Sequence, residues 1–317
     1  MPPRLSVIIP SRNACDTLAR AVGSALALPV DRFEVIVVDD GSTDGTAAWL
    51  AELAARDPRV VPLRRTADHG VAAARNAGIA VARAPLLGFL DADDVWYAEP
   101  IARRLAWHEA HPETVLSFSD YRTLLADGTL QDRYVASWPR FARFVGGRTG
   151  MLALGPAAFS LLVGENPVCT SSVLASRAAV LAAGGFDAGL RQAEDWDLWI
   201  RLSGQGAVAT STTVEVLHAN RPGSLSHDVA GRVAGIRTVV ARHRAQAWRR
   251  APGAALAASC LLAQAEAECA ERSGRFGRAL LRSIVAAAWH PSVQTARDAA
   301  RAALLATGLK KRGRRND

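Results

Sequence analysis

Residues 34–46 read EVIVVDDGSTDGT, a run of β-branched apolar residues that passes directly into an acidic, glycine-rich turn. Such a run is typical of a strand buried on both faces of a sheet, and the turn marks its carboxyl end. Upstream, LSVIIP at 5–10 has the same character and ends at a proline. Downstream, PLLGFL at 85–90 runs into the acidic segment DADD at 91–94, and 60–63 is a fourth short apolar run. The sequence therefore predicts three buried strands and a short fourth one at 60–63.

Helical patterns alternate with these strands at 18–28, 46–56 and 71–84, and Asn13 and Asp16 precede the first as capping residues. This alternation predicts an α/β fold, a mostly parallel, Rossmann-like sheet with helices on both faces. In such sheets, ligands bind outside the carboxyl ends of the strands. The polar clusters PSRN, DDGSTDGT and DADD all fall at strand ends, which is the first indication of a site.

The later chain divides into an irregular part and a helical part. Segment 115–164 carries aromatic residues and glycines without a regular period, which predicts a variable excursion. Ordered elements are expected after it, a strand at 166–176 and helices at 176–183 and 194–203. From residue 226 onward the pattern is helical, at 229–250, 253–273, 276–288 and 292–305. We therefore expect two domains, an α/β domain at 1–227 and a helical, basic extension at 228–317.

The 317 residues carry a formal net charge of +8, which is unevenly placed. Residues 228–317 hold 17 basic and 6 acidic side chains, a balance of +11, which leaves −3 for residues 1–227. A nucleic-acid surface on the α/β domain is therefore not expected. The four cysteines show no C-x-x-C spacing, which favours a reducing compartment and argues against a zinc or redox site. With no secretory signal and no run of about 18 apolar residues, the sequence predicts a cytoplasmic protein.

The segment DADD predicts a loop that binds a metal ion and a nucleotide. Closely spaced carboxylates at a strand end repel one another unless a cation offsets the repulsion. Hard oxygen ligands favour Mg²⁺ or Mn²⁺, which keep coordination positions for phosphate oxygens. We assign this chemistry to Asp91 and Asp93, with a purely structural turn as the alternative. Asp94 precedes a helical pattern and is expected to cap that helix.

Three further places have both a functional and a structural interpretation. Asp39 and Asp40 form either a plain turn or a site for the polar edge of a base or ribose. Because the chain has no glycine-rich phosphate loop, the metal must neutralise the phosphate, with Arg75 either as a helper or as an exposed helix charge. Glu194 and Asp195 open a helix, where acidic residues complement the helix dipole. Their other interpretation is a general base beside a diphosphate.

Together, these segments resemble the family 2 glycosyltransferases of GT-A fold over residues 4–226. The matching segments, in order, are SVIIPSRN, EVIVVDDGSTDGT, HGVAAARNAGIAVA, FLDADD and SSVLASRAAVLAAGGFDAGLRQAEDWDLWIRL. The resemblance implies an inverting, metal-dependent transfer of a sugar from a nucleotide-diphosphate sugar, with a UDP-sugar as the expected donor. It also implies a saccharide or lipid-linked acceptor that offers a hydroxyl group, in bacterial cell-surface polysaccharide or glycolipid synthesis.

The resemblance implies a nucleotide site at the ends of the first strands. Pro10 and Ser11 would line the nucleobase pocket, and Asp40 would contact the base, which is uracil if the donor is a UDP-sugar. Arg75 would lie beside the base or the phosphates, and Asp91 would approach the ribose. We place Asp39, the neighbour of Asp40 in the acidic turn, in the same nucleotide site.

The resemblance also implies the residues for metal binding and catalysis. Asp93 would coordinate the divalent ion, Mn²⁺ or Mg²⁺, that bridges the diphosphate. Asp195 would be the general base, and Glu194 would shape its surroundings.

One segment departs from the family pattern. Many relatives carry a histidine just before the P-G-S of a late loop, whereas Arg221 occupies that position in VLHANRPGSLSHD at 216–228. Either His218 or His227 takes over its role, or Arg221 pairs directly with the diphosphate. We name His218 as the candidate metal ligand, with an ordinary surface histidine as the alternative.

Residues 228–317 lie outside the resemblance, and their arginines alternate with alanine and leucine. Such helices form either an annex with a solvated basic face or a peripheral attachment to anionic lipid at the cytoplasmic face of the inner membrane. Two other function classes stay open, a sugar-1-phosphate nucleotidyltransferase of related fold and a basic nucleic-acid-binding protein. The first is disfavoured because PSRNACDT, after the first strand, has no glycine, and the second by the negative charge of residues 1–227.

Overall fold

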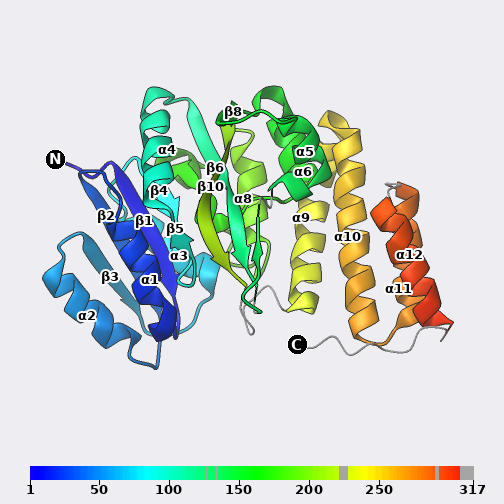
Figure 1. The fold of residues 1–317 in the computed structure, drawn as a ribbon, viewed down its shortest axis with the longest axis horizontal. Helices are drawn as coiled ribbons and strands as arrows, with labels where there is room; N and C mark the ends of the chain where they lie inside the picture. Colours follow the sequence, from blue (N-terminus) through cyan, green and yellow to red (C-terminus); the bar gives the residue numbers. More distant parts are fainter. Residues whose placement is uncertain (126, 133–134, 221–227, 290–292, 308–317) are drawn as a thin grey trace. The chain divides into compact units, whose positions relative to one another are not determined.

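A computed structural model describes residues 1–125, 127–132, 135–220, 228–289 and 293–307. Its strands join in the order β3-β2-β1-β4-β9-β6-β10-β5, with β7 beside β6 and β8 beside β10 (Figure 1). The strands are β1 (Leu5–Ser11), β2 (Phe33–Asp40), β3 (Val60–Arg65), β4 (Leu86–Phe89), β5 (Val95–Trp96), β6 (Thr114–Leu124), β7 (Leu130–Gln131), β8 (Met151–Ala153), β9 (Leu174–Ser176) and β10 (Ala207–Ala219).

Helices follow most of these strands along the chain. The α-helices are α1 (Cys15–Leu26), α2 (Thr46–Arg56), α3 (Val71–Val81), α4 (Ala98–Ala110), α5 (Pro139–Val145), α6 (Ala158–Gly164), α7 (Arg177–Ala182), α8 (Glu194–Leu202), α9 (Val229–Arg250), α10 (Pro252–Arg272), α11 (Phe276–Trp289) and α12 (Val293–Ala306). Short 3-10 turns are η1 (Val135–Ser137), η2 (Gly155–Ala157) and η3 (Thr170–Ser172).

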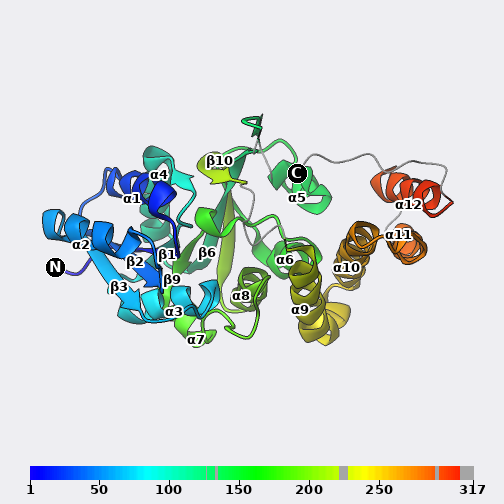
Figure 2. The ribbon, with the colours of Figure 1, turned by 90° about the horizontal axis from the view of Figure 1, so that it is seen from below.

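The predicted α/β fold is confirmed, with helices on both faces of the sheet. β3, β2, β1 and β4 pair in parallel, and β1 and β2 are buried along their whole length, as their unbroken apolar runs require. Figure 2 shows α1, α2 and α4 on one face and α3, α7 and α8 on the other. β6 and β10 also pair in parallel, whereas the shorter β5, β7, β8 and β9 join antiparallel.

Two long strands depart from the sequence-based expectation. β6 occupies the start of the segment that was expected to be irregular, and β10 lies where no element was assigned. β6 reads TVLSFSDYRTL and buries Ser117, Ser119 and Asp120 together with its apolar residues. These polar residues interrupt the apolar pattern from which a central strand would be predicted. The strand expected at 166–176 is also wrong in extent, because only β9 is extended and the turn η3 precedes it.

The chain forms two compact units. The first contains Met1–Ala158 and continues from Pro167 through β10, and the second contains Phe159–Asn166 and the helices α9 to α12. The expected helical extension is therefore present, and α6, which the sequence analysis placed in the first part, belongs to the second unit. In that unit the Arg250 guanidinium lies over the Phe159 ring, 4.5 Å from its centroid. A functional boundary between 227 and 228 stays a prediction.

Candidate active site

The carboxyl ends of β1, β2 and β4 meet at one edge of the sheet, because these neighbours run parallel. Ser11, the last residue of β1, is the register partner of Asp39, and Pro10 is the partner of Val38. Asp91 follows the end of β4 by two residues. The sequence-predicted residues of the first three strands therefore gather at the edge where α/β sheets bind ligands.

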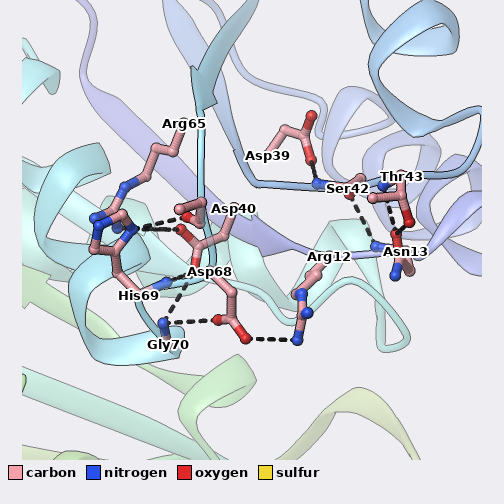
Figure 3. Close-up of polar contacts among 11 residues, drawn as sticks. Arg12, Asn13, Asp39, Asp40, Ser42, Thr43, Arg65, Asp68, His69 and Gly70 are labelled. Carbon is pink, nitrogen blue, oxygen red and sulfur yellow. Dashed lines mark hydrogen bonds and ion pairs between the residues drawn. The ribbon is translucent and has the colours of Figure 1, made fainter.

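Asp39 and Asp40 are both buried, but they point to opposite sides of β2, as consecutive strand residues do (Figure 3). Oδ1 of Asp39 accepts a hydrogen bond from the Ser42 backbone N–H at 3.1 Å and so closes the acidic turn. Oδ2 of Asp40 accepts two backbone N–H groups, from His69 and Gly70, each at 3.0 Å. Asp40 thereby fixes the loop that opens α3, and the structure does not place the two carboxylates in one pocket.

Asn13 serves the loops at the strand ends and does not cap α1 through its side chain. Its φ is +47°, its backbone N–H donates to Oγ of Ser42 at 2.9 Å, and its Oδ1 accepts the Thr43 backbone N–H at 2.9 Å (Figure 3). α1 begins at Cys15, its N-cap residue is Ala14, and no side chain caps it, so the expected capping role of Asn13 and Asp16 is wrong. The loops after β1 and β2 are instead tied to each other.

Several buried oxygen atoms at this edge have no hydrogen-bond partner among the described residues. They are Oγ of Ser11, Oδ2 of Asp39 and Oδ1 of Asp40. The last lies 3.4 Å from Nη1 of Arg65, which also lacks a hydrogen bond. Buried polar atoms are almost always satisfied in folded proteins, so unsatisfied atoms at a strand edge point to a polar ligand.

Arg75 is a buried cation and not an exposed helix charge. It lies in α3 with only 3% of its surface exposed. Its Nη2 donates to Oδ1 of Asp91 and its Nη1 donates to Oε1 of Glu194, both at 2.7 Å. The guanidinium also lies over the Phe186 ring, 5.2 Å from the centroid. One side chain therefore joins the loop after β4 to the start of α8.

Asn76, next to Arg75, holds the turn that supplies Phe186. Its Nδ2 donates to the Phe186 carbonyl at 2.7 Å, and its Oδ1 accepts the Phe186 N–H at 2.9 Å. A Cβ on Gly185, whose φ is +71°, would lie 2.6 Å from Oδ1 of Asn76, so glycine is required there. The sequence analysis did not single out Asn76 or Phe186, although both lie inside the matched segments ARN and GGFD.

Glu194 and Asp195 open α8, and Asp195 stands beside η3. Its Oδ2 accepts a hydrogen bond from Oγ1 of Thr170 at 2.9 Å, and its Oδ1 accepts the Trp196 N–H at 2.6 Å. Ala193, just before the helix, has a φ of +63°. A left-handed conformation is unusual for a residue other than glycine and costs about 1–2 kcal/mol. Local backbone strain therefore lies just before the helix that carries the candidate base.

In the described part of the chain, the charges of Asp91, Glu194 and Asp195 all act on the Arg75 guanidinium. Burial raises the pKa of Glu194 to about 7, and the charge of Asp195 adds to the rise while Arg75 opposes it. Burial likewise raises the pKa of Asp195, against the opposing effect of Arg75. Burial acts to lower the pKa of Arg75, but the charges of Asp91 and Glu194 outweigh it and raise that pKa. An acid whose pKa approaches neutrality is suited to proton transfer.

Asp94 is not the cap of the next helix, because β5 lies between them and α4 begins at Ala98 with Tyr97 as its N-cap residue. Asp94 is 1% exposed, its Oδ1 accepts the Ala219 N–H at 2.9 Å, and its Oδ2 accepts the hydroxyl of Ser171. Burial raises its pKa well above the ordinary value, and the charges of Asp91 and Asp93 add to that rise. Asp94 therefore fixes the acidic loop to the end of β10 and to η3.

His218, near the end of β10, faces the acidic loop. Its ring stands edge-on to Tyr121 at 5.9 Å, and its buried Nδ1 has no hydrogen-bond partner among the described residues. Burial lowers the pKa of His218, and the charges of Asp91 and Asp93 act in the opposite direction, so both carboxylates lie within electrostatic reach of the ring. An unsatisfied, neutral imidazole near carboxylates fits a divalent-metal ligand.

The metal-binding prediction meets a limit in the described residues. Asp93 is partly buried, and no group of three or more His, Cys, Asp or Glu side chains in the described part of the chain is placed to hold an ion by itself. Mg²⁺ and Mn²⁺ commonly take only one or two protein ligands and complete their shell with phosphate oxygens and water. The pair Asp93 and His218 fits that mode. Arg221 and His227 lie outside the described residues.

Comparisons with known proteins show which family and which fold this chain resembles. Residues 6–158 match the family model described as glycosyl transferase family 2, so the family resemblance is confirmed for this part of the chain. The succinoglycan biosynthesis protein ExoU of Rhizobium meliloti is 33% identical over 211 residues, which cover 65% of this chain and 58% of that protein. The chain spans little more than half the length of this relative.

Solved structures share the fold at low sequence identity. Staphylococcus aureus TarS 1–349 in complex with UDP-GlcNAc aligns with a TM-score of 0.62 at 15% identity, over 90% of this chain and 91% of that one. The mannosyltransferase PcManGT from Pyrobaculum calidifontis, in complex with GDP-Man and Mn²⁺, aligns with a TM-score of 0.60 at 24% identity, over 98% of this chain and 80% of that one. The predicted GT-A type of fold is therefore confirmed.

Proposed function

We propose, for a chain whose residues 6–158 match the model of glycosyl transferase family 2, an inverting transfer of a sugar from a nucleoside-diphosphate sugar to a hydroxyl group. The observation that carries this proposal is the buried centre in which Arg75 binds Asp91 and Glu194 beside Asp195. It combines a carboxylate of raised pKa with a loop of acidic residues at a strand edge. That combination suits a phosphate-containing donor and an acceptor that must lose a proton.

The nucleoside of the donor is assigned to the edge formed by β1 and β2. Pro10 and Ser11 lie at the end of β1. Oδ1 of Asp40 pairs with the Arg65 guanidinium at 3.4 Å but has no hydrogen bond, and we assign it to accept an N–H from a base. Asp39 offers an unsatisfied oxygen on the opposite side of β2. Asp91, held by Arg75, is assigned to the ribose. A UDP-sugar is the donor we propose, since uracil presents such an N–H between two carbonyl groups.

A divalent ion, Mn²⁺ or Mg²⁺, is assigned to Asp93 and His218. When bound, such an ion offsets the negative charge that develops on the departing nucleoside diphosphate. Arg75 donates one N–H of each terminal nitrogen to a carboxylate and keeps further N–H groups, Nε among them, so its role beside the base or the phosphates stays a prediction. The chain's own contribution is to keep the acidic loop in place, through Asp94 and its bonds to Ser171 and Ala219.

Asp195 is assigned as the general base. Its carboxylate takes the proton of the acceptor hydroxyl on the face of the sugar opposite the diphosphate, so that the configuration at the anomeric carbon inverts. A positioned base typically contributes about 10²–10⁴-fold to the rate. Glu194 is assigned to shape the surroundings of Asp195, whose charge adds to the rise in the pKa of Glu194.

The acceptor is proposed to be a saccharide or a lipid-linked saccharide in bacterial cell-surface polysaccharide or glycolipid synthesis. The support is the name of the relative ExoU, a succinoglycan biosynthesis protein, together with the basic helices of the second unit. A cytoplasmic position follows from this proposal, because nucleotide sugars are cytoplasmic substrates. No nucleic-acid partner is proposed, since residues 1–227 carry a charge of −3.

One face of α11 is proposed to contact anionic lipid at the cytoplasmic surface of the inner membrane. Leu281 and Ile284, three residues apart, are 60% and 50% exposed, and Arg278 is exposed three residues before them. Basic residues near a membrane surface contribute about 1 kcal/mol each, and exposed aliphatic side chains add apolar contact. In the part of the chain that is described, no helix is both long and apolar enough to cross a membrane.

Liposome flotation tests this contact. The full chain should float with vesicles of phosphatidylcholine and phosphatidylglycerol but not with phosphatidylcholine alone, and L281S/I284S should abolish flotation. Leu181→Ser, in an equally exposed aliphatic residue of α7, is the matched control and should float like the wild type. Equal flotation of all variants, or none, contradicts the assignment.

The transfer itself is tested by a donor screen. Thermal unfolding of the full chain is followed with UDP-glucose, UDP-GlcNAc or GDP-mannose, each with Mn²⁺, Mg²⁺ or EDTA. A donor at 100 times its Kd stabilises the folded state by about 2.7 kcal/mol, which is a clear rise in Tm. We expect such a rise for one donor, lost with EDTA, and slow release of its nucleotide to water. A protein indifferent to every donor and ion refutes the proposal.

A further inference from the structure

Three consecutive hydroxyl residues, Thr170, Ser171 and Ser172, form the turn η3 and are all buried. Their side chains or carbonyl groups bind three different parts of the first unit. Thr170 reaches α8, Ser171 reaches the acidic loop after β4, and Ser172 reaches α4. The turn η3 therefore contacts both the acidic loop after β4 and the start of α8.

Oδ2 of Asp195 accepts a hydrogen bond from Oγ1 of Thr170 at 2.9 Å. The other carboxylate oxygen, Oδ1, is occupied by the Trp196 backbone N–H. Together these two donors fix the carboxylate plane in two directions. They leave the remaining lone pairs of Oδ2 to accept a proton from an acceptor hydroxyl.

Ser171 ties the same turn to the donor side of the site. Its Oγ accepts the Asp91 backbone N–H at 3.0 Å and donates to Oδ2 of Asp94. Its carbonyl accepts the indole N–H of Trp96 at 2.6 Å. The distance between the candidate base and the acidic loop is therefore set by adjacent residues of one short turn.

The turn rests on a buried ion pair. Nη2 of Arg104 donates to the Ser172 carbonyl at 2.7 Å, and Nε of Arg104 donates to Oε2 of Glu215 at 2.7 Å. Arg104 also bonds Ser117, whose hydroxyl contacts the ring of His108. Burial, with a smaller contribution from Arg104, lowers the pKa of His108 to about 3, so this ring stays neutral. α4, β6 and β10 are thus joined under η3.

We propose that Thr170 is a positioning residue for the transfer reaction, and that its hydroxyl holds the Asp195 carboxylate in the orientation that accepts the proton. The inference rests on the proposed function, and the contacts of the turn η3 hold Thr170 in place. Hydrogen bonds to a charged group are stronger than neutral ones, and a 1 Å misplacement of a catalytic group costs orders of magnitude in rate.

The Thr170 bond also affects when Asp195 can act as a base. The bond stabilises the ionised carboxylate and so lowers the pKa of Asp195 relative to a centre without it. The charged and titratable groups around Asp195 are Glu194 in α8, Arg75 in α3, Asp91 after β4 and Cys169 before η3. A Thr170→Val variant leaves all of these in place and removes one hydroxyl group from a side chain of the same shape.

The test measures nucleotide release from the active donor of the screen, with water as acceptor, between pH 5.5 and 9. For Thr170→Val we expect kcat to fall about 10- to 100-fold, the loss typical of one hydrogen bond to a charged group. The acidic limb of the rate profile should move to higher pH, while the donor KM stays within about twofold, because the donor is bound elsewhere. Thr170→Ser, which keeps the hydroxyl, should restore the rate and the position of the limb.

Ser172→Ala is the matched control, because the hydroxyl that it removes belongs to the same turn but contacts the Cys169 carbonyl and not Asp195. It should lower Tm without moving the acidic limb. The inference is overturned if Thr170→Val moves the limb no more than Ser172→Ala, or if Thr170→Ser does not rescue. A wild-type protein that releases nucleotide from no donor refutes the proposed function instead, so the two failures are distinguishable.

Discussion

Replacing Arg75 by methionine removes the one cation that the structure places between Asp91 and Glu194. The guanidinium is 3% exposed and makes two contacts of 2.7 Å. Methionine fills a similar volume and carries no charge, so the buried Glu194 and the partly exposed Asp91 both lose the cation that pairs with them. Removing one partner of a buried ion pair costs about 3–5 kcal/mol, and we expect the variant to lose that much stability near neutral pH.

The loss should depend on pH with a defined sign. Burial already raises the pKa of Glu194 to about 7, and because Arg75 opposes that rise, its removal raises the pKa further. Acids with raised pKa values stabilise the folded state below the unfolded pKa and lose that contribution as pH rises through the folded pKa. The difference in unfolding free energy between wild type and Arg75→Met should therefore be smaller at pH 5 than at pH 8.

Urea unfolding at pH 5 and pH 8 measures this difference, with Arg75→Lys as the control. Lysine keeps the charge but lacks the planar guanidinium that donates to both carboxylates, so we expect an intermediate loss of stability. A loss below about 1 kcal/mol, typical of an exposed pair, would show that Arg75 is a surface charge. An equal loss at both pH values would show that the carboxylates are not its electrostatic partners.

Two further predictions concern the same site. Glu194 has a pKa of about 7 against an ordinary 4.5. The free energy of unfolding of the wild type should therefore fall by about 3 kcal/mol more than that of Glu194→Gln between pH 4.5 and 7.5. Urea-unfolding free energies of the two proteins that change in parallel with pH would contradict this. Gly41 has a φ of +77°, and an added Cβ would lie 2.9 Å from the Ala67 carbonyl carbon. Left-handed backbone strain costs a residue other than glycine about 1–2 kcal/mol, so Gly41→Ala should lower the free energy of unfolding by at least that amount and lower Tm. An unchanged Tm would refute the close approach.

Elements with one clear period could be predicted from the sequence. α2 begins and ends at the expected residues, and α9 at 229–250 does so too. β1, β2 and β4 lie within one or two residues of their expected bounds, because runs of β-branched residues have few alternatives. The gathering of polar residues at their ends follows from parallel pairing alone.

β6 and β10 could not be predicted in this way, because their burial depends on partners far away in the chain. Arg104 in α4 satisfies Glu215 in β10, 111 residues later, and this pairing lets both charges be buried. The prediction that Asp94 caps a helix was wrong because its surroundings also depend on a partner far away in the chain. The two-residue strand β5, which separates it from α4, exists only through its pairing with β10.

The candidate site shows the same division between local and long-range information. The sequence named Arg75, Asp91, Glu194 and Asp195, and the structure brings them into one centre. It left open whether Arg75 is an exposed helix charge, which the burial of the side chain now answers. The sequence analysis could not find Thr170, whose role depends on a contact across 25 residues between the turn η3 and the helix α8.

The central claim is that Asp195 takes the proton of the acceptor, and Asp195→Asn tests it most directly. Asparagine keeps the shape and a hydrogen-bond acceptor for Thr170 but cannot take a proton at neutral pH. Nucleotide release from the active donor should fall by at least about 10²-fold, while calorimetric titration gives a Kd for UDP with Mn²⁺ within about twofold of wild type. Retained turnover, or an equal loss of turnover and nucleotide affinity, would contradict the claim.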